Sequence, residues 1–390
     1  MPAGMPSAIV DPGGAPRDSA DVADAVAAAH ASRHPLRIVA AGTWLDAGRP
    51  VQLAGRLDLA NLRGIVEYVP GDLTLTARAA TPLAEIDAAT AVHGQWLPLD
   101  PLGAAEGTIG ATIATASAGP LGASIGLPRD LALGVEFVSG EGERIRGGGR
   151  VVKNVAGFDL VRHQVGAWGT LGVITEVTVR LRGRPEVDRT CVVPLPASAT
   201  GLDARVRTLA AVRGAPLAAE WVAGPLAESL GGPDGVVLVR LGGNVDAVEA
   251  QVRSLAALGD VRDAPAGTWT ALRDTVPDAS VTWRLSGAVA AFAATWARAC
   301  TGAPAGATVH GTPARGIVRT AAPAHVDAVA CVRHAIAGGP CIVERAPAAA
   351  WTHVPPAATD RLSSRLRVAL DPGAILNRGI FGAEAGTSHA

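Results

Sequence analysis

Residues 153–176, which read KNVAGFDLVRHQVGAWGTLGVITE, are the stretch that decides the fold of this chain. They contain a glycine-rich turn at residues 166–172, and the segment after it alternates apolar residues with Glu176 and Arg180. Alternation of this kind is typical of a half-buried β-strand. We therefore predict a tight turn that leads into a strand over residues 172–181.

Lys153 opens this stretch and is the only lysine among the 34 basic residues of the chain. Lysine is a compact charge on a flexible stem, whereas arginine is a rigid planar fork, so a confined site can accept one and exclude the other. Two interpretations stay open. Lys153 is either a chance survivor of an arginine-rich composition or a residue that a tight turn or anion site requires.

Length and composition limit the class of protein. A chain of 390 residues exceeds one ordinary core, so we expect two domains, and 48% hydrophobic residues suffice to fill them. A net charge of -1 gives no electrostatic footprint for nucleic acid. The sequence has no run of 18 or more apolar residues and no basic leader, so we expect a soluble, cytoplasmic protein with a disordered start at residues 1–17.

The cysteines do not form a recognisable metal or cluster motif. Cys191, Cys300, Cys331 and Cys341 show no C-x-x-C spacing and no paired histidines. Iron–sulfur and zinc signatures are therefore missing from the sequence. If the protein performs redox chemistry, its electrons must reach an acceptor by another route.

The first part of the chain predicts alternating helices and strands. Residues 19–32 form an alanine-rich helix that Asp18 or Ser19 can cap and that stops at Pro35. Residues 98–130 are rich in Gly, Ala, Ser and Thr. The other expected elements are a helix over residues 81–92 and strands over residues 36–39, 64–68, 73–77 and 133–139.

We predict a domain boundary at residues 182–185, which read RGRP. Beyond it, residues 235–241 predict a strand, and residues 246–258 and 324–336 predict helices. This alternation favours a second, small α+β module.

Glycine-rich loops can hold phosphates because backbone N–H groups can converge on an anion where no Cβ interferes. Residues 107–110 and 166–172 are the candidates. Neither matches a standard nucleotide loop: a Walker A motif is excluded by the position of Lys153, and no G-x-G-x-x-G opens a βαβ unit.

Two further patterns are weaker than they look. Residues 122–126, GASIG, match a serine-hydrolase nucleophile elbow, which needs a strand before it and a helix after it. Pro120 and Pro128 interrupt both flanks, so we favour a loop. His30 and His34 have helical spacing without a third ligand nearby, which favours a solvated helix end and predicts no metal site.

In this order, residues 35–43, 98–130, 153–159 and 166–176 resemble the FAD-binding domain of the vanillyl-alcohol-oxidase (PCMH-type) family. Within it, the chain is most similar to the FAD-binding subunits of glycolate oxidases, and the similarity continues through residues 282–286 to 370–379. The resemblance implies an α+β fold with a two-subdomain PCMH-type FAD-binding domain and a smaller α+β cap. The expected spans are 18–183 for the FAD-binding domain, 184–362 for the cap, and 363–382 for a C-terminal segment that packs back near the flavin domain.

The resemblance also implies FAD as the cofactor. The family's pyrophosphate loops and its Lys-to-Asp turn map onto a set of positions in this sequence: Ala40, Ala41, Gly42, Thr43, Pro101, Gly107, Thr108, Gly110, Ala114, Gly119, Gly126, Arg129, Asp130, Lys153, Asp159, Gly172 and Ile174. For Lys153 and Asp159 we expect a structural or phosphate-side role rather than a catalytic one.

Three departures from the family pattern bear on these expectations. Ala40 and Ala41 stand where the first loop of the family has adjacent glycines. The family's terminal Asn-Pro-Gly reads Asn377-Arg378-Gly379. Neither flavin loop offers the histidine that some relatives bond to the cofactor, so we expect non-covalent FAD.

Two function classes follow from the resemblance. The chain is expected to be an auxiliary flavin or electron-relay subunit of a 2-hydroxy acid dehydrogenase complex, together with a second FAD subunit and an iron–sulfur subunit that lead to the membrane. The sequence shows no counterpart of the histidine–glutamate metal cluster of the catalytic sister subunit. The alternative is a stand-alone FAD-dependent 2-hydroxy acid or alcohol oxidoreductase in which Arg284 pairs with the substrate carboxylate. Arg284 can equally be an ordinary surface or interdomain arginine.

The confined-site interpretation of Lys153 predicts that Lys153→Arg lowers flavin occupancy although the charge is kept, because the larger fork does not fit the same volume. The measurement is the FAD content of the purified variant, quantified in the supernatant after acid precipitation, where a non-covalent flavin appears. Equal FAD content and equal stability in wild type and variant would return Lys153 to the chance-survivor interpretation.

Overall fold

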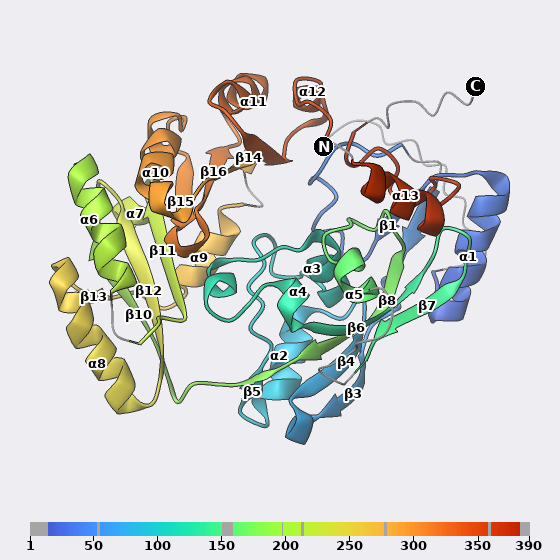
Figure 1. Cartoon of the computed structure of the whole chain (residues 1–390), viewed down its shortest axis with the longest axis horizontal. Coiled ribbons are helices and arrows are strands. Elements are labelled where there is room, and N and C mark those ends of the chain that lie inside the picture. Colours follow the sequence, from blue (N-terminus) through green and yellow to red (C-terminus); the bar gives the residue numbers. More distant parts are fainter. Residues whose placement is uncertain are drawn as a thin grey trace.

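The computed structural model describes residues 15–52, 55–149, 159–196, 198–211, 214–276, 279–357 and 360–382. Figure 1 shows two units beside each other, an N-terminal unit around a five-stranded sheet and a cap unit around an eight-stranded sheet. The expected α+β fold is confirmed. Within the described ranges, no helix combines the length and apolar character needed to cross a bilayer.

The N-terminal unit is organised around the strand predicted from residues 172–181. This strand, β8 (Val173–Arg180), lies at the centre of an antiparallel sheet of order β3-β4-β8-β6-β7, and its buried side chains include Val173, Val177 and Val179. The other strands are β3 (Ile65–Val69), β4 (Thr74–Arg78), β6 (Ala132–Val138) and β7 (Arg144–Gly148).

Helices and a strand pair complete this unit. Asp18 caps the first helix by accepting hydrogen bonds from the N–H groups of Ala20 and Asp21, as the sequence suggested. The parallel pair β1 and β2 lies beside it. The elements are α1 (Ser19–Ser32), β1 (Leu36–Val39), β2 (Gly55–Asp58), η1 (Pro70–Asp72), α2 (Leu83–Ala91), β5 (Gln95–Trp96), α3 (Ile109–Thr115), η2 (Pro120–Ala123), α4 (Pro128–Leu131), α5 (Leu160–Gln164) and β9 (Arg182–Gly183).

The cap unit is one antiparallel sheet of order β13-β10-β12-β11-β15-β16-β14-β17. Its strands are β10 (Val187–Pro194), β11 (Ala218–Ala223), β12 (Val236–Gly243), β13 (Arg262–Asp263), β14 (Ala279–Ser286), β15 (Thr308–Thr312), β16 (Ile317–Pro323) and β17 (Cys341–Arg345). The helical elements between them are α6 (Ala199–Ala210), α7 (Pro225–Ser229), α8 (Val245–Leu255), η3 (Ala256–Leu258), α9 (Thr268–Asp274), η4 (Val289–Ala291), α10 (Phe292–Thr301), η5 (Pro313–Arg315), α11 (Ala328–Ala337) and α12 (Ala348–Trp351).

The two faces of the cap sheet differ because successive residues of a strand point to opposite sides. Trp221 and its neighbours on one face pack against helices, and the Trp221 ring makes edge contacts with Phe292 and Trp296 of α10. Glu220 and His310 lie on the other face, in register with further polar residues on β16 and β14. Figure 1 shows α6, α8 and α10 on the side of the sheet away from the N-terminal unit. The polar face is therefore the one that meets the N-terminal unit.

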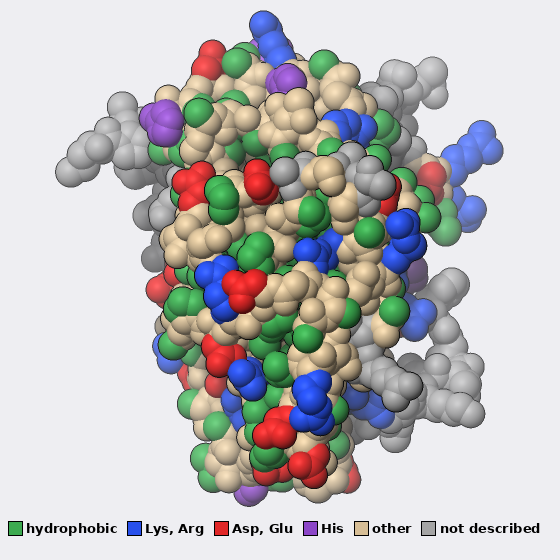
Figure 2. Space-filling model, turned by 90° about the vertical axis from the view of Figure 1, so that its left-hand side faces the viewer, with side chains coloured by type: hydrophobic (Ala, Val, Ile, Leu, Met, Phe, Trp, Pro, Cys, Tyr) green, Lys and Arg blue, Asp and Glu red, His purple; other side chains and the backbone are tan. Residues whose placement is uncertain are grey.

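The outer surface of the cap unit carries arginine and acidic side chains interspersed with hydrophobic ones, and Figure 2 shows no field of a single sign on that side. This mixture is ordinary for a solvated surface.

The end of the chain returns to the N-terminal unit. After α13 (Arg361–Leu370), the backbone runs beside β1: the N–H of Leu36 donates to the carbonyl of Ile375 at 2.7 Å, and the N–H of Asn377 donates to that of Leu36 at 2.9 Å. The side chain of Asn377 accepts from the N–H of Ile38 at 3.0 Å and donates to the carbonyl of Trp168 at 2.7 Å. One amide thus joins three segments that are far apart in sequence.

We expect Asn377→Ala to lower the free energy of unfolding by about 1–3 kcal/mol for each of the two backbone groups that lose their partner. Alanine also fits the left-handed φ of 43° at this position less well than asparagine. Urea unfolding followed by tryptophan fluorescence measures the change. Asn61→Ala, which removes one exposed hydrogen bond to Ala15, is the matched control and should stay within about 0.5 kcal/mol of wild type. Equal midpoints for the two variants would contradict the role given to Asn377.

Candidate functional site

A concave site, here called the cradle, lies where β1, α3, the start of β8 and the C-terminal segment meet. Its walls are residues 37–45, 110–115, 168–174 and 377–380, with Leu59 and Ala79 at the base. The strand β1 delivers its exit loop, residues 40–45, to one wall, and α3 forms the opposite one. Predicted residues that line the cradle are Ala40, Ala41, Gly42, Thr43, Gly110, Ala114, Gly172 and Ile174.

The exit loop explains why alanine is tolerated where the family has glycine. Gly42 has a φ of 78°, a conformation that side-chain-bearing residues rarely adopt, whereas Ala40 and Ala41 have no positive φ. Only Gly42 therefore needs to be glycine for the turn. The backbone N–H groups of Ala41, Gly42 and Thr43 donate to no other atom among the described residues.

Arg37 supplies positive charge to the cradle. Its side chain is 8% exposed, its Nη2 donates to the carbonyl of Trp44 at 3.3 Å, and its Nη1 has no partner among the described atoms. Desolvation lowers its pKa, which means that the buried cation is incompletely compensated. A buried guanidinium beside free N–H groups fits an anion such as a phosphate.

Two of the predicted glycines allow the close packing of the elements that surround the cradle. A Cβ at Gly110 would lie 2.6 Å from the Cβ of Ala79, so α3 approaches the end of β4 at a distance that only glycine allows. A Cβ at Gly172 would collide with the ring of Phe137. The close approach at these two glycines is to the protein itself, and it places α3 and β8 at the walls of the site.

The other predicted cofactor residues lie outside the cradle lining. Pro101, Gly107 and Thr108 precede α3, and Thr108 caps it. Asp159 caps α5 by accepting from the N–H of Arg162 at 3.0 Å, and Lys153 lies outside the described residues. Gly119 packs against the backbone of Asp100, while the carboxylate of Asp130 accepts from the N–H of Leu127 at 2.9 Å, next to Gly126 and Arg129.

A larger cavity of about 500 Å³, here called the central cavity, lies between the two units. Trp44, Thr115, Trp168 and Ile380 line both the cradle and this cavity. The rings of Trp44 and Trp168 meet edge to face with centroids 5.7 Å apart. These shared walls mean that a ligand longer than the cradle can extend into the central cavity.

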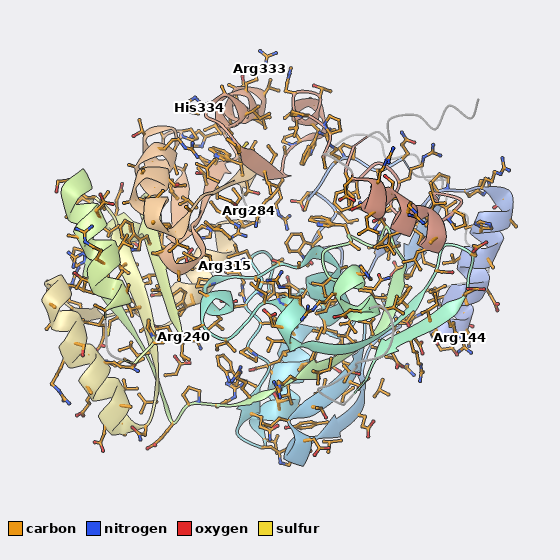
Figure 3. All side chains as sticks on the ribbon, in the orientation of Figure 1. Arg144, Arg240, Arg284, Arg315, Arg333 and His334 are labelled. Atoms are coloured by element: carbon orange, nitrogen blue, oxygen red, sulfur yellow. The ribbon has the colours of Figure 1, made fainter. Side chains whose placement is uncertain are left out.

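The cap side of the central cavity carries an excess of positive charge. The carboxylate of Glu344 pairs with Arg319 at 3.1 Å and with Arg284 at 3.4 Å, so two guanidinium groups share one anion. The atom of Arg284 in this ion pair is its buried Nε, which makes no hydrogen bond with any of the described residues. Desolvation, followed by the charge of Arg319, lowers the pKa of Arg284, whereas Glu344 opposes that shift. Figure 3 shows Arg284 on the side of the cap sheet that faces the N-terminal unit.

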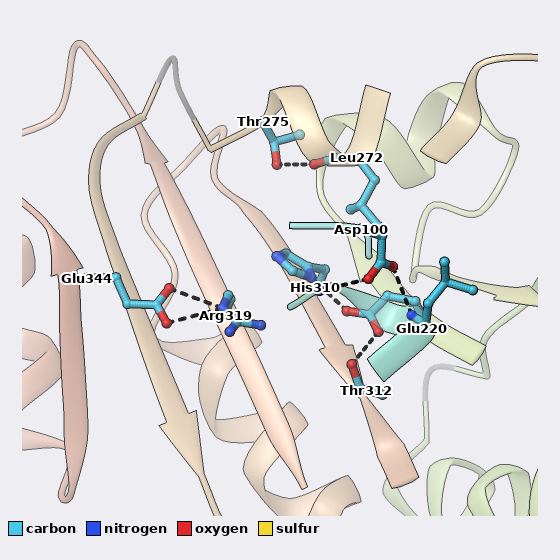
Figure 4. A network of polar contacts seen from close by, with 10 residues as sticks. Asp100, Glu220, Leu272, Thr275, His310, Thr312, Arg319 and Glu344 are labelled. Atoms are coloured by element: carbon cyan, nitrogen blue, oxygen red, sulfur yellow. Dashed lines mark hydrogen bonds and ion pairs between the residues drawn. The ribbon is translucent and has the colours of Figure 1, made fainter. Parts of the chain in front are cut away.

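A second polar cluster lies on the same face of the cap sheet (Figure 4). Glu220 and His310 are each 1% exposed, with Oε1 of Glu220 2.7 Å from Nδ1 of His310. The hydroxyl of Thr312 donates to Oε2 of the same carboxylate at 2.6 Å. This cluster fixes the Glu220 side chain at the contact between the units.

Asp100 approaches this cluster from the N-terminal unit (Figure 4) and accepts from the N–H groups of Gly119 at 3.1 Å and Leu121 at 2.8 Å. Burial raises the pKa of Asp100 from 3.8 to about 7; the charge of Glu220 acts in the same direction, and the two N–H donors oppose it. A carboxyl that holds its proton more tightly when folded makes the protein less stable as the pH rises between those two values. The raised pKa of Asp100 therefore predicts that folding becomes less favourable as the pH rises toward 7.

Sequence reasoning missed Arg37, Arg319, Glu344 and the two tryptophans of the shared wall. The position of Arg37 was a usable signal, because a charged residue in the otherwise apolar stretch 36–39 directly precedes the predicted loop. The sequence contained no such signal for Arg319 and Glu344, because only the pairing register of the strands brings them beside Arg284. Among the described residues, no group of three or more His, Cys, Asp or Glu side chains could hold a metal ion.

Comparison with known proteins assigns the N-terminal unit. Residues 14–148 match the family model described as "FAD binding domain". Over 152 residues the chain is 43% identical to glycolate oxidase subunit GlcE of Escherichia coli, which is 39% of this chain and 43% of that protein. Over 187 residues it is 33% identical to glycolate oxidase subunit GlcD of Bacillus subtilis, which is 48% of this chain and 39% of that protein. The chain thus matches about two fifths of the length of these relatives.

Solved structures extend the likeness to the whole fold. The p-cresol methylhydroxylase structure with substrate bound superposes with a TM-score of 0.73 at 15% identity, covering 95% of this chain and 88% of that one. The 4-ethylphenol oxidase from Gulosibacter chungangensis gives a TM-score of 0.65, also at 15% identity, over 94% of this chain and 88% of that one. Residues 14–148 therefore match the FAD-binding domain family, FAD is the cofactor, and the chain as a whole has the PCMH-type fold.

Proposed function

We propose that this chain is the FAD-binding subunit of a 2-hydroxy acid dehydrogenase complex of the glycolate oxidase type, and that it serves there as an auxiliary flavin or electron-relay subunit. The observation that carries the proposal is the cradle, with its buried, partly unpaired Arg37 and its free N–H groups, in a domain similar to that of a glycolate oxidase subunit. The partners proposed for it are a second FAD subunit and an iron–sulfur subunit.

The residues of the cradle fit the cofactor. Arg37 and the N–H groups of residues 41–43 would hold the pyrophosphate, while Gly42 keeps the loop in the conformation that exposes those groups. The bound flavin supplies two-electron chemistry by accepting a hydride. Because none of the described residues that line the cradle is a histidine, we expect the cofactor to be held without a covalent bond.

A second candidate function, a stand-alone FAD-dependent 2-hydroxy acid or alcohol oxidoreductase, is favoured by the central cavity. Two arginines share one carboxylate there, and among the described residues the Nε of Arg284 has only the 3.4 Å ion pair with Glu344 and no hydrogen bond, so the site is suited to a further anion. Arg284 and Arg319 would bind and orient a substrate carboxylate. Trp44 and Trp168, which form the shared wall, would exclude water from it.

If Arg284 binds a carboxylate, Arg284→Met should weaken the binding of oxalate, a non-oxidisable dicarboxylate, by roughly 10-fold to 100-fold, because a charge-assisted hydrogen bond is lost. Folding stability should be kept, since the methionine removes a desolvated charge. Titration calorimetry of the FAD-loaded chain with oxalate measures the effect. Arg298→Met is the control, because Arg298 donates to the carbonyl of Gly338 away from the cavity. Unchanged oxalate binding in the Arg284 variant would restore the view of Arg284 as an ordinary interdomain arginine.

The subunit proposal predicts that the isolated, flavin-loaded chain oxidises glycolate or lactate far more slowly than the complex obtained by co-purification with its partners. Dye-linked dehydrogenase assays with both acids make the comparison, with the flavin content of each sample matched. Turnover by the isolated chain at roughly 1 to 10³ per second, the usual range for enzymes, would instead support the stand-alone oxidoreductase.

A further inference from the structure

Arg345 reaches from the last strand of the cap sheet to the cofactor loop of the N-terminal unit. Its side chain is 4% exposed, and its Nη2 donates to the carbonyl of Thr43 at 3.1 Å. Its Nη1 forms an ion pair with Asp46, and its guanidinium lies 4.8 Å from the ring centroid of Trp44. Three contacts from one side chain thus fall on residues 43–46, and two of the three contacted residues, Thr43 and Trp44, line the cradle.

The backbone and a second arginine reinforce this contact. The N–H of Gly48 donates to the carbonyl of Glu344 at 2.9 Å, and Ala47 pairs with Arg345 as an antiparallel bridge. Arg49 reaches in the opposite direction, where its Nη1 donates to the carbonyl of Trp351 at 3.2 Å. The segment that continues the cofactor loop is therefore held between the units from both sides.

The residue next to Arg345 belongs to the charged group of the central cavity. Glu344 pairs with both Arg319 and Arg284, so two cations share one anion, and the Nε of Arg284 makes no hydrogen bond with any described residue. A carboxylate that binds these arginines changes the charge balance around Glu344. Glu344 and Arg345 are consecutive on a short strand, so the change is one peptide unit away from the side chain that holds the cofactor loop.

We infer that Arg345 is a positioning residue that couples occupancy of the central cavity by a carboxylate to the affinity of the cradle for FAD. This inference rests on the proposed carboxylate site of the second candidate function. An anion bound to the arginines would order β17 and so favour the conformation in which Arg345 holds residues 43–46. FAD would then lose less conformational entropy when it binds, because the loop that it contacts is already ordered. By linkage, FAD must strengthen binding of the anion by the same factor.

The test compares FAD dissociation constants with and without saturating oxalate, measured by the quenching of tryptophan fluorescence on titration with FAD. In the wild-type chain we expect oxalate to tighten FAD binding by roughly 5-fold to 150-fold, the usual range of such couplings. In Arg345→Met, FAD binding should weaken and the ratio of the two constants should fall to near unity. Arg345→Lys keeps the charge but not the planar fork, so it should restore only part of the coupling.

Two further variants separate coupling from a loss of structure. Asp46→Asn removes the ion-pair partner at a side chain that is 60% exposed, so it should fold, and it should also lower the ratio. Arg205→Met is the matched control, because Arg205 joins the carbonyls of Leu258 and Pro194 within the cap and should leave the ratio at its wild-type value.

The outcomes distinguish the inference from the proposal beneath it. Weaker FAD binding with an undiminished ratio in Arg345→Met and Asp46→Asn would overturn the coupling and leave Arg345 a purely structural residue. Oxalate that binds the wild-type chain without changing FAD affinity would overturn the inference alone. Failure of oxalate to bind the FAD-loaded chain at all would overturn the carboxylate site, and the inference with it.

Discussion

The close packing of α3 against the end of β4 is the constraint on which the site depends. Gly110 leaves no room for a Cβ beside Ala79, so the helix lies directly on the sheet. This approach places α3 beside the cradle, which the exit loop of β1 also lines. The fold therefore creates a binding site through contacts within the protein, and glycine is needed there whether or not a ligand is bound.

The main contribution of the cap unit to the site is its charged side chains. Its sheet buries an apolar face against helices, which leaves the polar face toward the N-terminal unit. Charged groups removed from water are costly unless they are paired, and here Arg284 and Arg319 share a single carboxylate. Two cations that share one anion in this way are typical of sites in which a bound ligand supplies the second negative charge. The same face carries the Glu220–His310 contact, in which both oxygens of the carboxylate and Nδ1 of His310 have partners, whereas Nε2 of His310 has none among the described residues.

Local sequence signals predicted the helices and strands, and the family resemblance predicted the cofactor. Both were less successful for the residues that form the site. The alternation over residues 172–181 predicted β8 to within one residue at each end, and Asp18 caps the first helix as its residue type suggested. The family resemblance assigned residues 40–43 to the cofactor; the structure places them in the lining of the cradle, and their contact with FAD stays a prediction. Arg319 and Glu344 could not be found in this way, since strand register, a non-local property, brings them to Arg284. The assignments of Gly126, Arg129, Asp130 and Asp159 to the cofactor stay predictions.

Most residues that line the cradle come from the first part of the chain, but contacts from residues 345 and 377 hold its walls in place. Arg345 holds residues 43–46, and Asn377 binds both β1 and the turn at Trp168. These pairs are separated by about three hundred residues or, for Trp168, by 209. Contacts between such distant segments form late in folding, because the intervening chain must first be ordered. During synthesis the binding site for FAD can therefore be completed only after Arg345 and Asn377 have left the ribosome.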